Sequence, residues 1–120
     1  MNGLPMCDIL LPDGRRWGTC EIAGRFFARL RGLLGRKGLP DNHALRILRC
    51  NAVHTVGMKF NLDLIFLSSD GCVTRILRDI PPGRLFVGGG IRSNEVLEAE
   101  TGRVDLDAIP PGTRLTFRQG

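Results

Sequence analysis

The segment from Leu62 to Leu67 constrains the fold more than any other part of the chain. It reads Leu-Asp-Leu-Ile-Phe-Leu, and Ser-Ser-Asp-Gly follows it before a second extended pattern at residues 72–77. Asp-Gly between two apolar runs is typical of the tight turn that joins neighbouring antiparallel strands. The sequence therefore predicts that these two segments form an antiparallel hairpin in the core.

Several other short segments have the alternation of strands. Turn signals separate them: Pro-Asp-Gly at residues 12–14, and Pro-Pro-Gly at both 81–83 and 110–112. Many short strands with regularly spaced turns are typical of a mainly β fold, so we expect a β-sandwich or barrel-like domain of short antiparallel strands. The expected strands are residues 7–11, 16–22, 44–48, 52–56, 62–67, 72–77, 95–99 and 114–117.

One segment has a different period. Apolar residues at helical spacing between 25 and 34 predict one amphipathic helix near residues 24–35, which Gly35 and Gly38 then end. On this helix we expect Arg25 and Arg29 to lie together on one flank, with Arg36 one turn beyond. Such a stripe is either a solvated face or part of a binding site.

The composition is that of a folded protein with one core. The chain has 120 residues, 42% hydrophobic and 24% charged, so we expect a single domain over residues 1–120. No run approaches the roughly 20 apolar residues of a membrane-spanning helix, and the first residues lack the pattern of a secretory leader. We therefore expect a cytoplasmic protein with no membrane partner.

The net charge of +5 points to an anionic ligand or an acidic partner. Residues 1–60 carry ten basic and four acidic residues, whereas residues 61–120 carry seven and eight. The chain has no tyrosine, one tryptophan and no basic run interleaved with aromatics, which argues against nucleic-acid binding.

The four cysteines have long, unequal spacings and no Cys-x-x-Cys pair, so we expect reduced, mostly buried thiols and no structural zinc. Cys50, His54 and Met58 could bind Cu(I) only if the chain folds back at Gly57, because an extended strand separates neighbouring members by about 13 Å. The sequence predicts no metal and no cofactor.

Three ordered motifs carry a family resemblance. They are Gly-Leu-Leu-Gly-Arg-Lys-Gly-Leu at 32–39, Leu-Asp-Leu-Ile-Phe-Leu at 62–67 and Val-Leu-Glu-Ala-Glu-Thr-Gly at 96–102. Over residues 20–117 the chain resembles the prokaryotic family called domain of unknown function 192. The resemblance implies a mainly β, sandwich-like single domain with no established activity. His54 and Asn61 stand where many members have a tryptophan and a proline.

The candidate ligand-binding residues are charged groups of both signs. A cleft combining them would suit a small binding or accessory domain that holds a small polar ligand or a peptide. In the alternative structural reading, Arg36 only pins the helix end to the sheet. The candidates are Arg36, His54, Lys59, Asp63 and Glu98.

A small enzyme is a further alternative, with His54 as base, Asp63 as orienting group and Cys50 or Thr55 as nucleophile. No catalytic motif supports it, so whether the chain is an enzyme stays open. A purely structural or interaction role is equally compatible with the sequence.

Asp63 carries the most specific expectation. It shares a strand face with Ile65 and Leu67, and a carboxylate among apolar neighbours needs donors. We predict that Asp63 is buried and accepts hydrogen bonds, first from Arg36 and second from backbone N–H groups near Gly57.

Overall fold

The computed structural model describes residues 6–24 and 36–119. Within these ranges the chain is mainly β, and the described residues include no helix long and apolar enough to span a membrane. One short 3-10 turn, η1, follows the eighth strand. The elements are β1 (Met6–Leu10), β2 (Arg16–Gly24), β3 (His43–Leu48), β4 (Ala52–Val53), β5 (Leu62–Leu67), β6 (Val73–Ile80), β7 (Val87–Gly88), β8 (Glu95–Glu100), η1 (Leu106–Ala108) and β9 (Thr116–Gln119).

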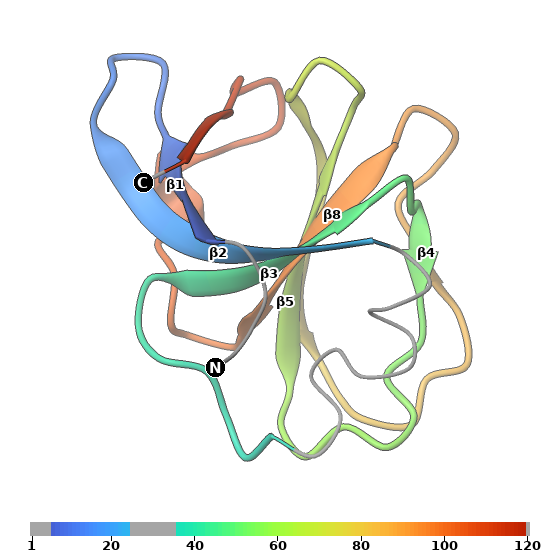
Figure 1. Cartoon of the computed structure of the whole chain (residues 1–120). Helices are drawn as coiled ribbons and strands as arrows, with labels where there is room; N and C mark the ends of the chain where they lie inside the picture. Colours follow the sequence, from blue (N-terminus) through green and yellow to red (C-terminus); the bar gives the residue numbers. More distant parts are fainter. Residues whose placement is uncertain (1–5, 25–35, 120) are drawn as a thin grey trace.

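Seven strands form one mixed sheet in the order β6-β5-β8-β3-β2-β1-β9, and β4 pairs with β7 in a separate two-stranded sheet (Figure 1). The predicted hairpin is confirmed, since β5 and β6 pair antiparallel and all six β5 residues are buried. The opening hairpin of β1 and β2 is confirmed as well. Strands β3 and β8 lie where the alternation predicts them.

The expectation of an all-antiparallel sheet is wrong at one pair. Strands β2 and β3 run parallel, with Cys20 opposite Ala44. Parallel neighbours need a long crossover, and the connection between Gly24 and His43 supplies the length. The predicted helix at residues 24–35 falls in this connection; residues 25–35 lie outside the described residues, and the described residues contain no α-helix.

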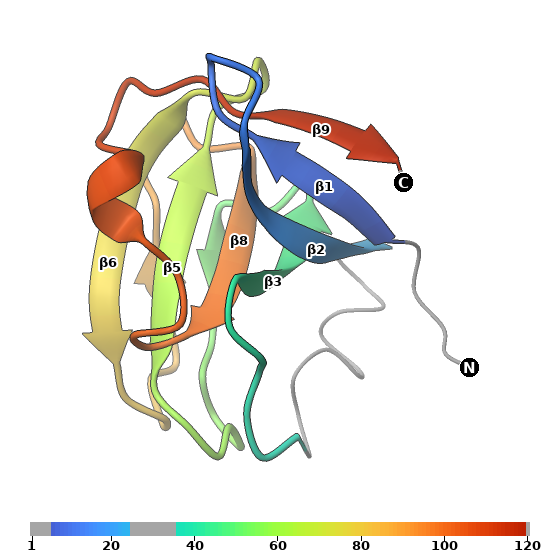
Figure 2. The ribbon, with the colours of Figure 1, turned by 90° about the vertical axis from the view of Figure 1, so that its left-hand side faces the viewer.

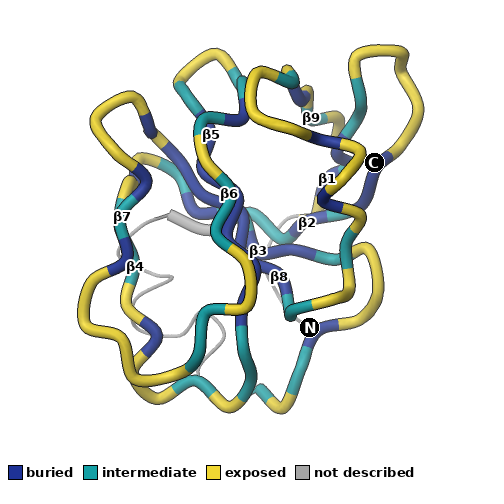
Figure 3. Tube along the Cα trace, turned by 180° about the vertical axis from the view of Figure 1, so that it is seen from behind, coloured by how far each residue is buried: buried dark blue, intermediate teal, exposed yellow. Residues whose placement is uncertain are grey.

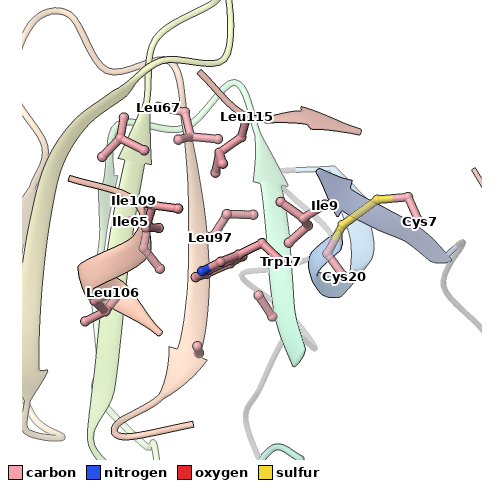
Figure 4. Packing of buried hydrophobic residues seen from close by; sticks show 13 residues of the cluster. Cys7, Ile9, Trp17, Cys20, Ile65, Leu67, Leu97, Leu106, Ile109 and Leu115 are labelled. Atoms are coloured by element: carbon pink, nitrogen blue, oxygen red, sulfur yellow. A yellow bond between two sulfur atoms is a disulfide. The ribbon is translucent and has the colours of Figure 1, made fainter. Parts of the chain in front are cut away.

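The main sheet separates two apolar clusters. The inner cluster lies on the concave face, where the curled sheet wraps around it (Figures 2 and 4). The outer cluster lies on the opposite face, beneath the small sheet. Buried members of the inner cluster are Cys7, Ile9, Trp17, Cys20, Ala44, Ile65, Leu67, Val73, Leu97, Ala99, Leu106, Ile109 and Leu115. Those of the outer cluster are Leu39, Leu45, Ile47, Cys50, Leu62, Leu64, Phe66, Val87 and Val96.

Because the sheet curls, the start of its edge strand β6 lies against the segment that leads into the other edge strand, β9. The N–H of Val73 donates to the carbonyl of Thr113 at 2.8 Å, and Cys72 forms a bridge with Arg114 just before β9. The indole N–H of Trp17 donates to the carbonyl of Asp105 at 2.8 Å, which ties the segment before η1 across the inner cluster. These links close one end of the sheet around its apolar contents.

The expectation of four reduced thiols is wrong for one pair. Cys7 and Cys20 lie directly opposite each other in β1 and β2, 5.4 Å apart at Cα, and form a disulfide (Figure 4). Spacing along the sequence could not reveal this pair, because the strand register brings together residues 13 positions apart. Cys50 and Cys72 are free.

Candidate ligand-binding cleft

A cleft of about 590 Å³ opens between β6 and the small sheet. Its volume lies within the range of roughly 300 to 1,000 Å³ typical of ligand pockets. Strand β6 contributes one wall, and the segment that runs into β7 contributes the other. The lining residues are Asn51, Arg75, Leu77, Ile80, Arg84, Phe86, Val87, Gly88 and Gly90.

A fully buried threonine holds the loop that carries Arg84. The hydroxyl of Thr55 donates to the carbonyl of Pro81 at 2.8 Å and accepts the N–H of Arg84 at 2.9 Å. The N–H of Thr55 also donates to the carbonyl of Arg84 at 2.9 Å. Between these contacts Gly83 turns the chain with φ +94°, a conformation that glycine adopts without strain. The position of Arg84 is therefore fixed by buried hydrogen bonds.

The other end of the same wall rests directly on the core. At Gly89 the backbone lies so close to the ring of Phe66 that an added Cβ would overlap it. The hydroxyl of Ser93 donates to the carbonyl of Gly89 at 2.8 Å and lies 2.7 Å from the hydroxyl of Thr74 on β6. Within the glycine run at 88–90, Gly89 is thus packed against the core.

The cleft gathers arginines that have no acidic partner. Eight arginines of the described chain lie within 4.0 Å of a carboxylate oxygen, and the four that do not are Arg49, Arg75, Arg84 and Arg92. Arg75 and Arg84 line the cleft, while Arg49 and Arg92 each lie two residues from a lining residue. Two of the four unpaired arginines of the described chain therefore line the cleft, and the other two are close to lining residues in the sequence.

Large apolar side chains are exposed in the same region. Leu85, Phe86 and Ile91 are 85%, 77% and 97% exposed, and the loops that carry them stand out from the core (Figure 3). Single exposed apolar residues are ordinary, but a group of them beside a cleft is typical of a binding surface. The guanidinium of Arg75 also donates to the carbonyl of Gly88 at 3.2 Å across the cleft.

The sequence-predicted candidates occupy other places. Arg36 forms two hydrogen bonds of 2.8 Å with the carboxylate of Glu21, and the Nε2 of His43 lies 2.7 Å from the same carboxylate. The hydrogen bonds from Arg36, aided by the contact with His43, lower the pKa of Glu21 to about 2. This geometry corresponds to the structural alternative for Arg36.

Asp63 is buried and accepts hydrogen bonds, as predicted, but its donors differ from the predicted ones. It accepts the N–H of Asp79 at 2.9 Å and the N–H of Gly102 at 3.2 Å, one on each carboxylate oxygen. Asp79 lies in β6 where the register with β5 shifts, and has φ +56°, whereas Gly102 lies in the turn after β8, with φ +84°. Asp63 is the acceptor because the bulge and the turn leave these N–H groups outside the strand ladder.

Glu98 lies on the opposite side of the sheet from Asp63. Asp63 pairs with Ala99, whereas Glu98 pairs with Leu64 and therefore faces the outer cluster. Within the described chain no group forms a hydrogen bond with its carboxyl group. Burial raises the pKa of Glu98 to about 7. The structure thus keeps Asp63 and Glu98 apart, on two faces of one sheet.

His54 and Lys59 are exposed, and neither lines the cleft. His54 precedes Thr55, so its backbone lies beside the Arg84 loop. The hydroxyl of Thr55 is fully engaged by that loop, and the thiol of Cys50 donates to the carbonyl of Ala52 at 2.9 Å. The side chains of both candidate nucleophiles, Thr55 and Cys50, are therefore engaged in hydrogen bonds that hold the backbone.

The described residues contain no cluster of three or more His, Cys, Asp or Glu side chains that could hold a metal ion. What the cleft offers instead is a pair of guanidinium groups, an exposed aromatic ring and the apolar side chains of Leu77, Ile80 and Val87. Guanidinium groups bind carboxylates and phosphates through paired hydrogen bonds. The cleft is chemically suited to an anion with an apolar portion.

Sequence reasoning missed Arg75 and Arg84. The second half of the chain is nearly neutral, with seven basic and eight acidic residues, and this balance hides the local excess. The acids of that half are engaged elsewhere: Glu95 with Arg46, Asp70 with Arg114, and Asp107 with Arg78. The sequence offered one signal for this site: an arginine and two large apolar residues, Arg-Leu-Phe at 84–86, directly follow the turn Pro-Pro-Gly at 81–83.

Comparison with known proteins places this arrangement in a family. The fold is a curled, mixed β-sheet domain with a small second sheet, and the chain belongs to the family DUF192, described as "Uncharacterized ACR", whose model matches residues 9–117. A comparison with curated proteins gives no match.

Two solved structures have the same fold. One is a protein from Sinorhizobium meliloti described as a putative transcription regulator, with 23% identity, a TM-score of 0.79, and coverage of 96% of this chain and 94% of that one. The other is a protein of unknown function from Novosphingobium aromaticivorans, with 22% identity, a TM-score of 0.75, and coverage of 92% and 83%. At these identities the likeness establishes the fold alone.

Proposed function

We propose that this chain is a small binding domain that holds an anionic ligand in the cleft between β6 and β7. As expected from the sequence, the proposed site is a charged cleft for a small polar ligand or peptide. Its position in the fold differs from the one expected. Arg75 and Arg84 replace the five sequence candidates as the recognising groups.

One observation carries the proposal: each arginine without an acidic partner in the described chain either lines one cleft or is two residues from a residue that does. Elsewhere on the described surface an arginine has a carboxylate within 4.0 Å, even where both side chains are exposed. Arginine stays charged at any physiological pH, so the cleft carries a permanent positive potential. That potential attracts anions, and no carboxylate of the described chain occupies the guanidinium groups, although Arg75 donates one hydrogen bond to the carbonyl of Gly88.

The surrounding side chains supply the second half of the recognition. Phe86 presents an exposed ring, and Leu77, Ile80 and Val87 form apolar surface next to the guanidinium groups. A few oriented polar groups on an apolar lining are the usual composition of a ligand site. A catalytic role for His54 with Asp63 has less support, because the carboxylate of Asp63 already accepts two backbone N–H groups.

The test is a titration with small dicarboxylates and a tricarboxylate. Isothermal titration calorimetry with succinate, glutarate and citrate, at about 50 mM salt to limit screening, should give saturable binding to the wild-type protein. The double variant Arg75→Ala/Arg84→Ala should lose it. Binding should also raise the unfolding temperature of the wild-type protein, because only the folded state has the site.

The matched control removes the same charge at a distance from the cleft. Arg15 and Arg118 are exposed and paired with Asp13 and Asp8. The double variant Arg15→Ala/Arg118→Ala should bind the anions as the wild-type protein does. Equal loss in both double variants would show that net charge alone attracts the anions, and the proposal would be withdrawn.

A further inference from the structure

The cleft lies between two strand edges. Strand β6 is the terminal strand of the main sheet, and β7 is paired only with β4 in the small sheet. Residues of both strands line the cleft: Arg75, Leu77 and Ile80 from β6, and Val87 and Gly88 from β7. A molecule in the cleft therefore meets backbone edges as well as side chains.

The outer edge of β6 is only partly used. Residues 112 and 113 pair with its first residue, since Val73 donates to Thr113 and accepts from Gly112 at 2.8 and 2.7 Å. Beyond Val73, the described chain provides no backbone hydrogen bond to β6 from outside the sheet. The segment from Arg75 to Ile80 spans about 17 Å at roughly 3.4 Å per residue, which is enough for a short added strand.

Exposed strand edges readily pair with another chain, and proteins commonly cover or charge them to prevent this. Here the edge carries arginines, which repel a second basic chain but attract an acidic one. The exposed side chain of Phe86 lines the same cleft, and the exposed Leu85 and Ile91 are next to lining residues in the sequence. An edge that only had to be protected would not need this apolar surface around it.

We infer that the ligand of the cleft is an extended, acidic segment of another protein, which adds to the edge of β6 as a further strand. This inference rests on the proposed function and names the class of its ligand. Backbone N–H and C=O groups of the segment pair with β6, as in other cases of strand addition. Its acidic side chains lie on the cleft side, with their carboxylates at Arg75 and Arg84 and their methylene groups against Leu77 and Phe86. The alternate, apolar side chains lie on the other face of the added strand, the face that carries Ile76.

The described surface favours a peptide over a single-stranded nucleic acid. Binding of single strands uses several aromatic rings on which successive bases stack. The chain has no tyrosine, and its one tryptophan, Trp17, is buried in the inner cluster. Among the described residues, Phe86 is the one aromatic residue that lines the cleft.

The probe is a fluorescein-labelled hexapeptide of alternating glutamate and valine, followed by fluorescence anisotropy at about 50 mM salt. Alternation places all glutamates on one face of the strand and so fixes its register. Two further peptides carry N-methyl groups on either the glutamates or the valines. One set of N–H groups points to β6 and the other to solvent, so one methylated peptide should bind about tenfold or more weakly while the other binds as the parent does.

Variants locate the interaction. Arg75→Ala/Arg84→Ala and Phe86→Ala should each weaken binding of the hexapeptide, whereas Arg15→Ala/Arg118→Ala should leave it unchanged. Replacing every glutamate of the peptide by lysine should abolish binding. A twelve-nucleotide oligothymidine should bind more weakly than the hexapeptide; tighter binding of the oligonucleotide at the same cleft would overturn the inference.

The outcomes separate this inference from the proposed function. If citrate and the hexapeptide bind through Arg75 and Arg84 but neither methylated peptide loses affinity, the cleft binds anions without strand addition, and the inference fails alone. If the arginine substitutions change neither citrate nor peptide binding, the proposed function fails and the inference fails with it. Loss with one methylated peptide and not the other supports both.

Discussion

The centre of the main sheet and the cleft differ in whether their charged side chains have partners. In the sheet, carboxylates are paired: Glu21 with Arg36 and His43, Glu95 with Arg46, and Asp63 with two backbone N–H groups. In the cleft, arginines stand without a carboxylate in the described chain. Pairing in the sheet removes the penalty of burying charge, whereas the unpaired charges of the cleft stay available to a ligand.

Within the sheet, Glu98 is the exception. Glu21 and Glu98 flank Leu45 from either side, each paired with it in register, yet one pKa is lowered to about 2 and the other is raised to about 7. This difference in pKa comes from the groups that contact each carboxyl group and not from its position in the sheet. A carboxyl group with a guanidinium partner stays charged, and one that is only buried prefers its proton.

The largest expected effect concerns Glu98 and pH. Both folded and unfolded chains hold this proton below about pH 4.5, and only the folded chain still holds it as the pH rises to about 7. Stability should therefore fall over this window by an amount on the order of 3 kcal/mol, and level off above it. Glu98→Gln should remove this fall and be more stable than the wild-type protein at pH 8, as measured by urea denaturation at pH 5 and 8.

Asp107→Asn serves as the control for that series, because the Asp107 carboxylate is 92% exposed. The raised pKa of Glu98 would be contradicted if the free energies of unfolding of the wild-type protein and Glu98→Gln differed by the same amount at pH 5 and pH 8.

The second expectation concerns Asp63. Asn in its place would turn an amide NH2 group towards one of the two N–H donors, so one donor would lose its acceptor. We expect Asp63→Asn to lower the free energy of unfolding by about 1 to 3 kcal/mol. Urea denaturation at pH 7 measures this loss. Unchanged or increased stability would show that the carboxylate is maintained for a ligand and not for the N–H groups of Asp79 and Gly102.

A smaller effect is expected at Glu21. Glu21→Gln keeps the shape but loses the charge that pairs with Arg36, and partial exposure of the guanidinium screens the pair. We expect a loss of about 1 kcal/mol at pH 7. Because the pKa of Glu21 is lowered, the contribution is fully present above about pH 4.5 and is lost as the pH falls towards 2. Denaturation of both proteins between pH 2 and 7 checks this sign.

The smallest effect on stability is expected in the cleft. Arg75→Ala/Arg84→Ala removes two exposed, unpaired charges and should change the free energy of unfolding by no more than about 0.5 kcal/mol. The same variant should lose anion binding. A large loss of stability would place these arginines with the structural pairs of the sheet and end the contrast between the two regions.

Sequence patterns predicted the parts of the fold that depend on local order. The β5–β6 and β1–β2 hairpins follow from alternation and turn residues that lie close together in the chain. The parallel pairing of β2 with β3 and the Cys7–Cys20 disulfide depend on register and crossover, which no short window of sequence contains. The burial of Asp63 was predictable from its neighbours, but its donors come from residues 16 and 39 positions away.

The candidate site was harder to predict for a related reason. Charged residues near the family motifs, such as Arg36 and Glu98, attract attention, but contacts within the sheet determine which charges remain unpaired. Arg75 and Arg84 became visible only when the ion pairs of the folded chain showed which arginines have a carboxylate partner. An unpaired charge is a property of the folded chain and not of a motif.

The contact between Gly89 and Phe66 sets a limit on how this protein can diverge. The wall of the cleft rests on a core ring with no room for a side chain, so its distance from β6 is determined by the size of residue 66. A relative with a larger residue at position 89 would need a smaller one at 66. Such paired exchanges among homologues would change the width of the cleft from inside the core, and ligand preference would diverge while the arginines that line it stay the same.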